Sequence, residues 1–250
     1  MAGVSRSLRA LWTIFKHEFN LYFDSPIIYL IGAVWLFLAG GFFSLSLLVM
    51  NQGMTEPSMT GMLSPMVFLM IFIAPALTMR SVAEELRAGT HELLFTAPVR
   101  DWEIILGKWL AAWAVFTLFV LATVVYPFIL LQRGNPDVGL IATGYLGLWL
   151  MGGATLAVGV LASTLTQYQL VAFIVSIGVM IFLWVADVVT QFVNNSTVVT
   201  VLNEIAITPH YRSLFTRAVL DPIDIAYFVA LTVIALFLAT QLLSTRRWSA

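Results

Sequence analysis

Long apolar stretches without charged residues dominate the chain. Five runs contain no Asp, Glu, Lys or Arg: Ser25–Thr55, Pro57–Met79, Trp109–Gln132, Val138–Ala186 and Ile225–Thr245. The 49 residues from Val138 to Ala186 are enough for two crossings, divided by the polar sequence Thr164–Gln169. A helix needs about 20 apolar residues to cross the hydrocarbon core of a bilayer. The pattern therefore predicts one all-α transmembrane domain over residues 1–250, with spans at residues 27–50, 62–79, 109–131, 140–163, 170–193 and 225–245.

The residues before the first span have a different pattern. Over residues 5–24, large apolar side chains recur every three or four positions, with charged residues largely on the other faces: Leu8, Leu11, Trp12, Phe15, Phe19 and Phe23. This spacing predicts an amphipathic helix that lies at the membrane interface. Pro26 then breaks the helix and turns the chain into the bilayer. Two interpretations remain open: a simple membrane anchor, or an elbow helix that also contacts a cytoplasmic partner.

Composition supports a membrane protein and excludes several kinds of site. The chain is 60% hydrophobic and 10% charged, whereas a soluble domain carries about a quarter charged residues. The net charge of −1 argues against a nucleic-acid partner. The absence of cysteine excludes disulfides, thiolate zinc sites and cysteine nucleophiles.

The positions of lysine and arginine predict the orientation. With the N-terminus inside, nine of these residues fall on the cytoplasmic side and three on the outer side, Arg133, Arg212 and Arg217. Cytoplasmic loops of membrane proteins carry the excess of positive charge. We therefore expect both termini in the cytoplasm, as an even number of spans requires.

Few residues offer chemistry. The three histidines fall outside the spans, and the pair His91-Glu92 lacks the second histidine of the zinc-protease pattern. Gly107-Lys108 is not preceded by the glycine of a phosphate-binding loop. From these observations together we expect no catalytic residue and no bound cofactor or metal on this chain. Asp187 is the one charged residue well inside a span, near its outer end. It is either a candidate pathway residue that contacts an ion or substrate, or a solvated residue at a hydrated mouth.

The segment from residue 80 to residue 108 holds nine of the 25 formal charges, on the predicted cytoplasmic side. Glu84 and Glu85 are expected to continue the second helix beyond the membrane, and Gly89 to end it as a C-terminal cap. Thr90 would then cap a short helix at residues 91–95, and Asp101 would cap the helix entering the third span. Such a segment is either a stiff lever joined to two membrane helices or a well-solvated loop.

The second long connection, residues 194–222, lies on the predicted outer side. Tyr211, Leu214, Phe215, Ala218 and Val219 have helical spacing within it. This stripe favours a short helix at the outer interface or dipping back into the protein. The alternative is a partly ordered loop.

The charged inner segment resembles the coupling region of the ABC type-2 permease superfamily. The residues that carry the resemblance are Glu84, Glu85, Gly89, Thr90, Glu92, Pro98, Gly107 and Lys108. The C-terminal part is most similar to the gliding-motility-type permease branch, on a pattern of Tyr211, Phe215 to Asp221, Asp224, Tyr227, Phe228 and Arg246 to Trp248. Ala218 departs from that pattern, because glycine is expected there.

The resemblance implies a function and partners. It implies the membrane-spanning subunit of an ATP-driven exporter in a bacterial inner membrane, not itself an enzyme. Two ATPase subunits that bind ATP and magnesium would sit against the coupling segment. A second permease copy, identical or related, would complete the assembly, surrounded by membrane lipid. The alternatives are a secondary transporter or channel working without ATP, and a membrane enzyme, which the missing nucleophile and base disfavour.

Overall fold

The computed structural model describes residues 2–52, 58–89, 99–193, 195–217 and 221–249. These residues form helices and no strand: α1 (Ala2–Asp24), α2 (Pro26–Asn51), α3 (Thr60–Thr78), α4 (Ala83–Ala88), α6 (Asp101–Thr123), α7 (Val125–Arg133), α8 (Val138–Leu165), α9 (Gln169–Val189), the 3₁₀ turn η1 (Thr190–Phe192), α10 (Ser196–Ile205), α11 (Ile207–Arg217) and α12 (Pro222–Ser249). Six helical stretches in these ranges are long and apolar enough to span a membrane, which confirms the predicted fold class.

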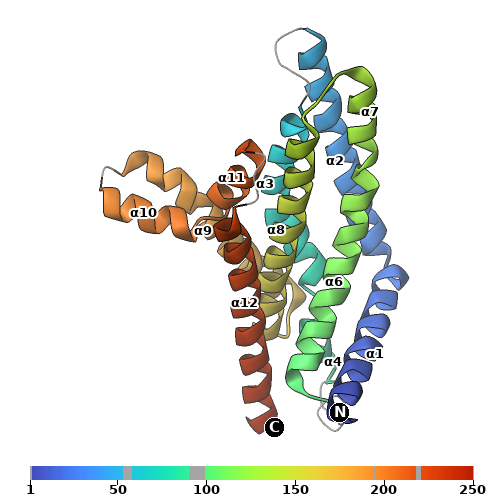
Figure 1. Cartoon of the computed structure of the whole chain (residues 1–250). Helices are drawn as coiled ribbons and strands as arrows, with labels where there is room; N and C mark the ends of the chain where they lie inside the picture. Colours follow the sequence, from blue (N-terminus) through green and yellow to red (C-terminus); the bar gives the residue numbers. More distant parts are fainter. Residues whose placement is uncertain (1, 53–57, 90–98, 194, 218–220, 250) are drawn as a thin grey trace.

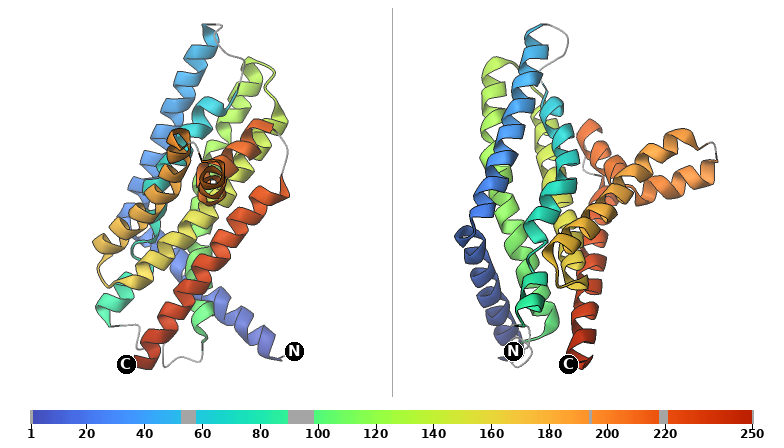
Figure 2. Two further views of the ribbon diagram at one scale, coloured as in Figure 1. Left: turned by 90° about the vertical axis from the view of Figure 1, so that its left-hand side faces the viewer. Right: turned by 180° about the vertical axis from the view of Figure 1, so that it is seen from behind.

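The helices form an elongated bundle with one projecting arm. In Figure 1, α2, α3, α6, α8 and α12 run along the bundle, and both chain termini lie at its lower end. We call this the N/C end. The C-terminal part of α9, together with η1 and α10, leaves the bundle sideways, as Figure 1 and the right-hand view of Figure 2 show. α11 then returns the chain to the bundle, where it packs against α8.

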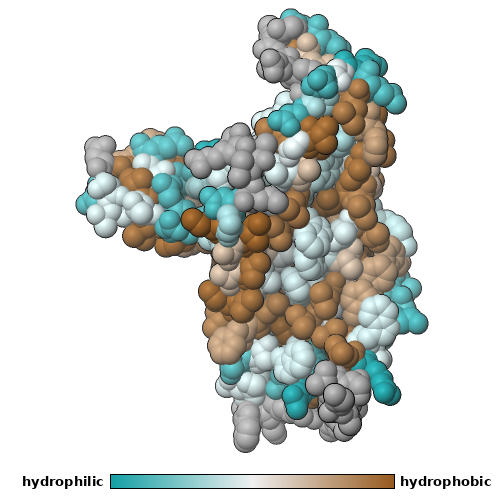
Figure 3. Space-filling view, viewed as in Figure 1, coloured by the Kyte–Doolittle hydropathy of each residue, from teal (hydrophilic) through white to brown (hydrophobic). Residues whose placement is uncertain are grey.

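The outside of the bundle is apolar. Phe37 on α2 is 79% exposed and Phe182 on α9 is 64% exposed. Figure 3 shows hydrophobic surface along the flank, while hydrophilic surface gathers towards the two ends. Large exposed apolar patches of this kind mark surfaces that contact other proteins or a membrane. With six helices of spanning length, the chain is a multi-pass membrane protein.

α8 is the central helix, and its glycines explain why. It packs against α3, α6, α9, α11 and α12. A Cβ added at Gly152 would lie 2.0 Å from the ring of Phe116, and one at Gly159 would lie 2.0 Å from the Thr78 hydroxyl. Neighbouring helices therefore approach α8 more closely than any larger residue would allow.

Indole groups join α6 to α8. Trp109 and Trp113 stack with ring centroids 4.8 Å apart, and Trp113 stacks on Trp149 of α8 at 4.2 Å. Each ring also uses its N–H: Trp109 donates to the Gly153 carbonyl at 2.8 Å, and Trp149 donates to the Thr117 hydroxyl at 2.9 Å. A buried indole is stable when its N–H has a partner, so this stack fixes α6 against α8.

The third span breaks just before a proline. α6 ends at Thr123 and α7 begins at Val125, two residues before Pro127. Proline has no N–H to donate to the carbonyl four residues earlier, which here belongs to Thr123. The Tyr145 hydroxyl of α8 donates to that carbonyl at 2.9 Å and replaces the lost bond.

The connection between α9 and α12 contains two helices, α10 and α11. His210 Nδ1 lies 2.8 Å from Asp224 Oδ1 of α12, and the Ser213 hydroxyl donates to the other oxygen of the same carboxylate. The His210 ring stacks on Tyr227 with centroids 4.0 Å apart. Tyr211 of the predicted stripe is buried. These contacts attach α11 to the bundle; residues 218–220 of the stripe lie outside the described residues.

Candidate functional site

Five of the predicted coupling residues come together at the N/C end. Glu84 and Glu85 lie on α4, Gly89 ends that helix, and Gly107 and Lys108 lie in the second turn of α6. The other three, Thr90, Glu92 and Pro98, lie outside the described residues, as does the predicted helix at residues 91–95. The candidate site therefore consists of α4 and α6, the helices on either side of residues 90–98, together with the residues that they contact.

The second helix does not continue unbroken to Gly89, which corrects the sequence prediction. α3 ends at Thr78, and α4 begins at Ala83 after a turn. Ser163 of α8 occupies this break: its hydroxyl accepts hydrogen bonds from the N–H groups of Val82 and Ala83, at 3.1 and 3.0 Å, and donates to the Met79 carbonyl at 3.2 Å. One side chain thus satisfies three backbone groups that the break leaves without helical partners.

The ends of the connection are capped in two ways. Gly89 has a φ of 72°, the left-handed conformation expected of a C-terminal cap. Asp101 is not the cap of α6, as predicted from the sequence, but its first residue. Arg100 precedes the helix, and the Glu103 carboxylate accepts a hydrogen bond from the Arg100 N–H at 3.0 Å. A longer side chain one turn into the helix can reach back to this N–H.

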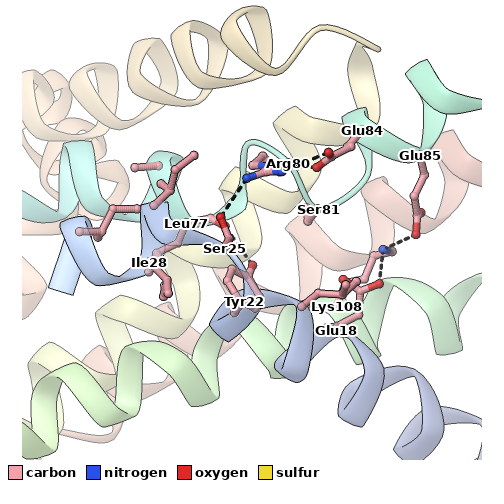
Figure 4. Close-up of a pocket in the computed structure, with 14 residues that line it drawn as sticks. Glu18, Tyr22, Ser25, Ile28, Leu77, Arg80, Ser81, Glu84, Glu85 and Lys108 are labelled. Carbon is pink, nitrogen blue, oxygen red and sulfur yellow. Dashed lines mark hydrogen bonds and ion pairs between the residues drawn. The ribbon is translucent and has the colours of Figure 1, made fainter.

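Lys108 is the centre of a buried ion cluster. Its side chain is 2% exposed, and Nζ lies 2.6 Å from Glu18 Oε1 of α1 and 2.7 Å from Glu85 Oε1 of α4. Figure 4 shows the ammonium between the two carboxylates. A buried charge is stable only when paired and hydrogen-bonded, so these two contacts hold three helices in one arrangement. We call Glu18, Glu85 and Lys108 the ion triad.

A close backbone approach brings α1 to the triad. A Cβ at Gly107 would lie 2.8 Å from Ile14 Cγ2 and 3.5 Å from the backbone nitrogen of Phe15. The absence of a side chain at Gly107 therefore lets α1 lie directly on α6. α1 is thus part of the bundle at this end, while its other face leaves Leu8 and Trp12 each 62% exposed.

A second polar group joins α1, α2 and α3 beside the triad. The Tyr22 hydroxyl donates to the Leu77 carbonyl at 2.9 Å. Burial raises the pKa of Tyr22 well above its usual value; Glu18 adds to this and Arg80 opposes it. The phenol therefore remains a neutral donor. Arg80 donates from Nε and Nη2 to the Glu84 carboxylate, at 2.9 and 3.1 Å, and from Nη1 to the Ser25 hydroxyl at 3.1 Å.

Sequence reasoning missed the partners of the coupling residues: Glu18, Ser163, Tyr22 and Ser25. One signal was present. Ile14, Glu18 and Tyr22 are spaced by four residues, so they share one face of α1. A carboxylate between two apolar residues on that face indicates a buried cation partner. No comparable signal identifies Ser163, because nothing local to α8 reveals a break in α3.

Asp187 lies away from this site, near the C-terminal end of α9. Its Oδ2 is 3.3 Å from Arg212 Nη2 of α11, and its side chain is 14% exposed. The contact connects the arm to α11. Chemically, the N/C end holds ion pairs and backbone caps, so it is suited to transmit a displacement between helices.

Comparison with known proteins gives one match. A family model described as ABC-2 family transporter protein matches residues 12–248. Among curated proteins, no relative matches the chain. The family match includes the whole of the ion triad and all six spanning stretches.

Proposed function

Because the chain belongs to the ABC-2 family of transporter proteins and is the membrane permease of an ABC transporter, we propose that it is the exporter type, driven by a separate ATPase. The family match over residues 12–248 is the observation that carries this proposal. The gliding-motility-type branch, suggested by the C-terminal residues, is part of the same proposal. ATP and magnesium would be bound by two copies of the ATPase and not by this chain.

The ATPase is proposed to dock at the N/C end, against the connection between α4 and α6. Two features support this site. Gly89 and Arg100 define both ends of the connection, so a displacement of it acts directly on two helices. The ion triad then links α4 and α6 to α1, and Ser163 links the break before α4 to α8. A push by the ATPase would therefore move α1, α4 and α6 together and change the tilt of α3 and α6.

The permease is proposed to work as two copies, identical or related, in a bacterial inner membrane. The path for the exported molecule would then lie between the copies. The nine-to-three distribution of lysine and arginine supports a cytoplasmic N/C end. This orientation exposes the α4–α6 connection to the compartment that contains ATP.

Co-purification tests the proposed function. The tagged chain, solubilised from its native membrane in a mild detergent, should retain an ATPase polypeptide that hydrolyses ATP. A different result would support a secondary transporter or channel: the chain retains no ATPase, and transport in native vesicles continues after ATP is removed.

Single-cysteine labelling tests the orientation. The chain has no cysteine, so each variant carries one thiol. Asn135→Cys and Thr197→Cys, both at exposed positions, should react with a membrane-impermeant maleimide in intact cells, because both lie in connections between spans that are proposed to face outside. Ala88→Cys, exposed on α4, should react only after the cells are opened. Labelling of Ala88→Cys in sealed cells would reverse the orientation.

A further inference from the structure

A cavity of about 310 Å³ lies at the N/C end between α1, α2, α3 and α4. Its lining has two chemically different parts, as the side chains in Figure 4 show. One part is apolar and comes from α1, α2 and α3. The other is polar and surrounds Arg80. A cavity of this size is at the lower end of what small-ligand sites have, about 300 Å³ and above.

The apolar part faces the outside of the bundle at the membrane boundary. Leu21 and Ile27 line the cavity and are 47% and 39% exposed, so its mouth opens between α1 and α2. Ile31, one turn further along the span, also lines the cavity and reaches about 6 Å deeper. The cavity thus extends from the first residues of the span at Pro26 into the apolar layer.

The polar part contains both signs of charge. Arg80 and Lys108 contribute two positive charges, and Glu18, Glu84 and Glu85 contribute three negative charges. Lys108 is enclosed by the triad, whereas the Arg80–Glu84 pair is half exposed, with side chains 36% and 49% accessible. Guanidinium has five N–H donors, of which the bonds to Glu84 and Ser25 use three. Arg80 therefore retains donors for an anionic group, and Glu84 retains acceptor sites for a cationic one.

We propose that this cavity binds a phospholipid, from the leaflet at the N/C end, whose head group carries a primary ammonium, of the phosphatidylethanolamine class. The phosphate binds the Arg80 guanidinium, which matches its planar donors. The ammonium donates hydrogen bonds to the Glu84 carboxylate, which a choline head group cannot do because it has no N–H. The first part of the acyl chains lies along Ile27 and Ile31. An anionic head group is disfavoured, because the five ionisable side chains already sum to one negative charge. This proposal goes beyond the transport function and requires only that the chain is in a membrane.

Native mass spectrometry of the full-length chain tests the site. The protein is equilibrated with equal amounts of phosphatidylethanolamine, phosphatidylcholine and phosphatidylglycerol of identical acyl chains. Phosphatidylethanolamine should be retained preferentially. Arg80→Gln should reduce its retention by roughly tenfold or more, because a charge-assisted hydrogen bond is lost. Arg87→Gln is the matched control, since Arg87 is exposed on α4 and does not line the cavity.

A steric variant tests the cavity without changing its charge. Ala76→Trp places a large side chain in the cavity and should remove lipid retention while the unfolding temperature stays near that of the wild type. Excess soluble glycerophosphoethanolamine should not compete, because it lacks acyl chains. The proposal would be overturned if the three lipids were retained equally, or if phosphatidylglycerol were preferred. It would also be overturned if the soluble head group competed fully, or if retention were unchanged in both Arg80→Gln and Ala76→Trp.

Discussion

Lys108→Met is expected to be among the most destabilising single substitutions in the chain. It removes the ammonium that lies within 2.7 Å of both Glu18 and Glu85 and leaves two carboxylates close together in a mostly buried site. Removing one partner of a buried ion pair costs about 3–5 kcal/mol. Thermal unfolding in detergent should show this loss as a lower midpoint, and ATP hydrolysis by the complex should lose its dependence on transport because α1 and α4 are no longer held to α6.

Two further variants separate the charge from the side chain. Lys16→Met, at an exposed position on α1, also removes an ammonium and should leave the free energy of unfolding within about 0.5 kcal/mol of the wild type. The second variant is a triple substitution that replaces the whole ion triad by neutral groups of similar size: Glu18→Gln, Glu85→Gln and Lys108→Met. It should recover most of the stability. A Lys108→Met protein as stable as the Lys16→Met protein would show that the triad does not hold the helices together.

Gly89→Pro is expected to abolish coupled ATP hydrolysis while the chain still inserts into the membrane. Gly89 has a φ of 72°, whereas proline is fixed near −65°, so the chain must leave α4 in a different direction. Such a conformational conflict costs more than about 1 kcal/mol. Because the change acts on the direction of the α4–α6 connection, substrate-stimulated ATPase activity in nanodiscs should fall by at least about tenfold.

Asparagine provides the matched control at this position. It adopts the left-handed conformation more readily than other residues with a side chain. Among the described residues, no atom lies within 4 Å of a Cβ added at Gly89, so the asparagine side chain meets no steric conflict with them. Gly89→Asn should therefore keep most of the activity. Equal activity in the proline and asparagine variants would show that this connection does not transmit the signal from the ATPase.

The overall architecture could be predicted because it depends on properties that are local in the sequence. Apolar runs of 21 residues and more define six spans, since each must cover the same bilayer thickness. The cap at Gly89 was predictable for a similar reason, because the absence of a Cβ has a direct effect on the backbone. The glycines of α8 allow close packing in a similar way, but no local rule shows that Phe116 and Thr78 lie opposite them.

The contacts of the site could not be predicted in the same way. Glu18 and Lys108 are 90 residues apart, and no local rule says that α1 lies on α6. The interruption of the second helix depends on Ser163, which reaches it from another helix. Glu85 forms an ion pair with Lys108, so charge reversal at Glu85 would disturb the fold as well as any docking surface. Gly89 lies at the end of α4 and outside the ion triad, so a substitution there tests the coupling without removing an ion pair.

Photo-crosslinking from α4 tests the central claim most directly, namely that the N/C end couples this permease to an ATPase. A photoreactive amino acid replaces Arg87, which is exposed on α4. A second variant carries it at Asn135, in the connection after α7, the helix that lies at the opposite end of the bundle in Figure 1. After illumination of native membranes, we expect the Arg87 variant to capture a polypeptide that binds and hydrolyses ATP, and the Asn135 variant to capture none. Transport-competent protein that captures no ATPase from Arg87, or captures it equally from both positions, would contradict the account.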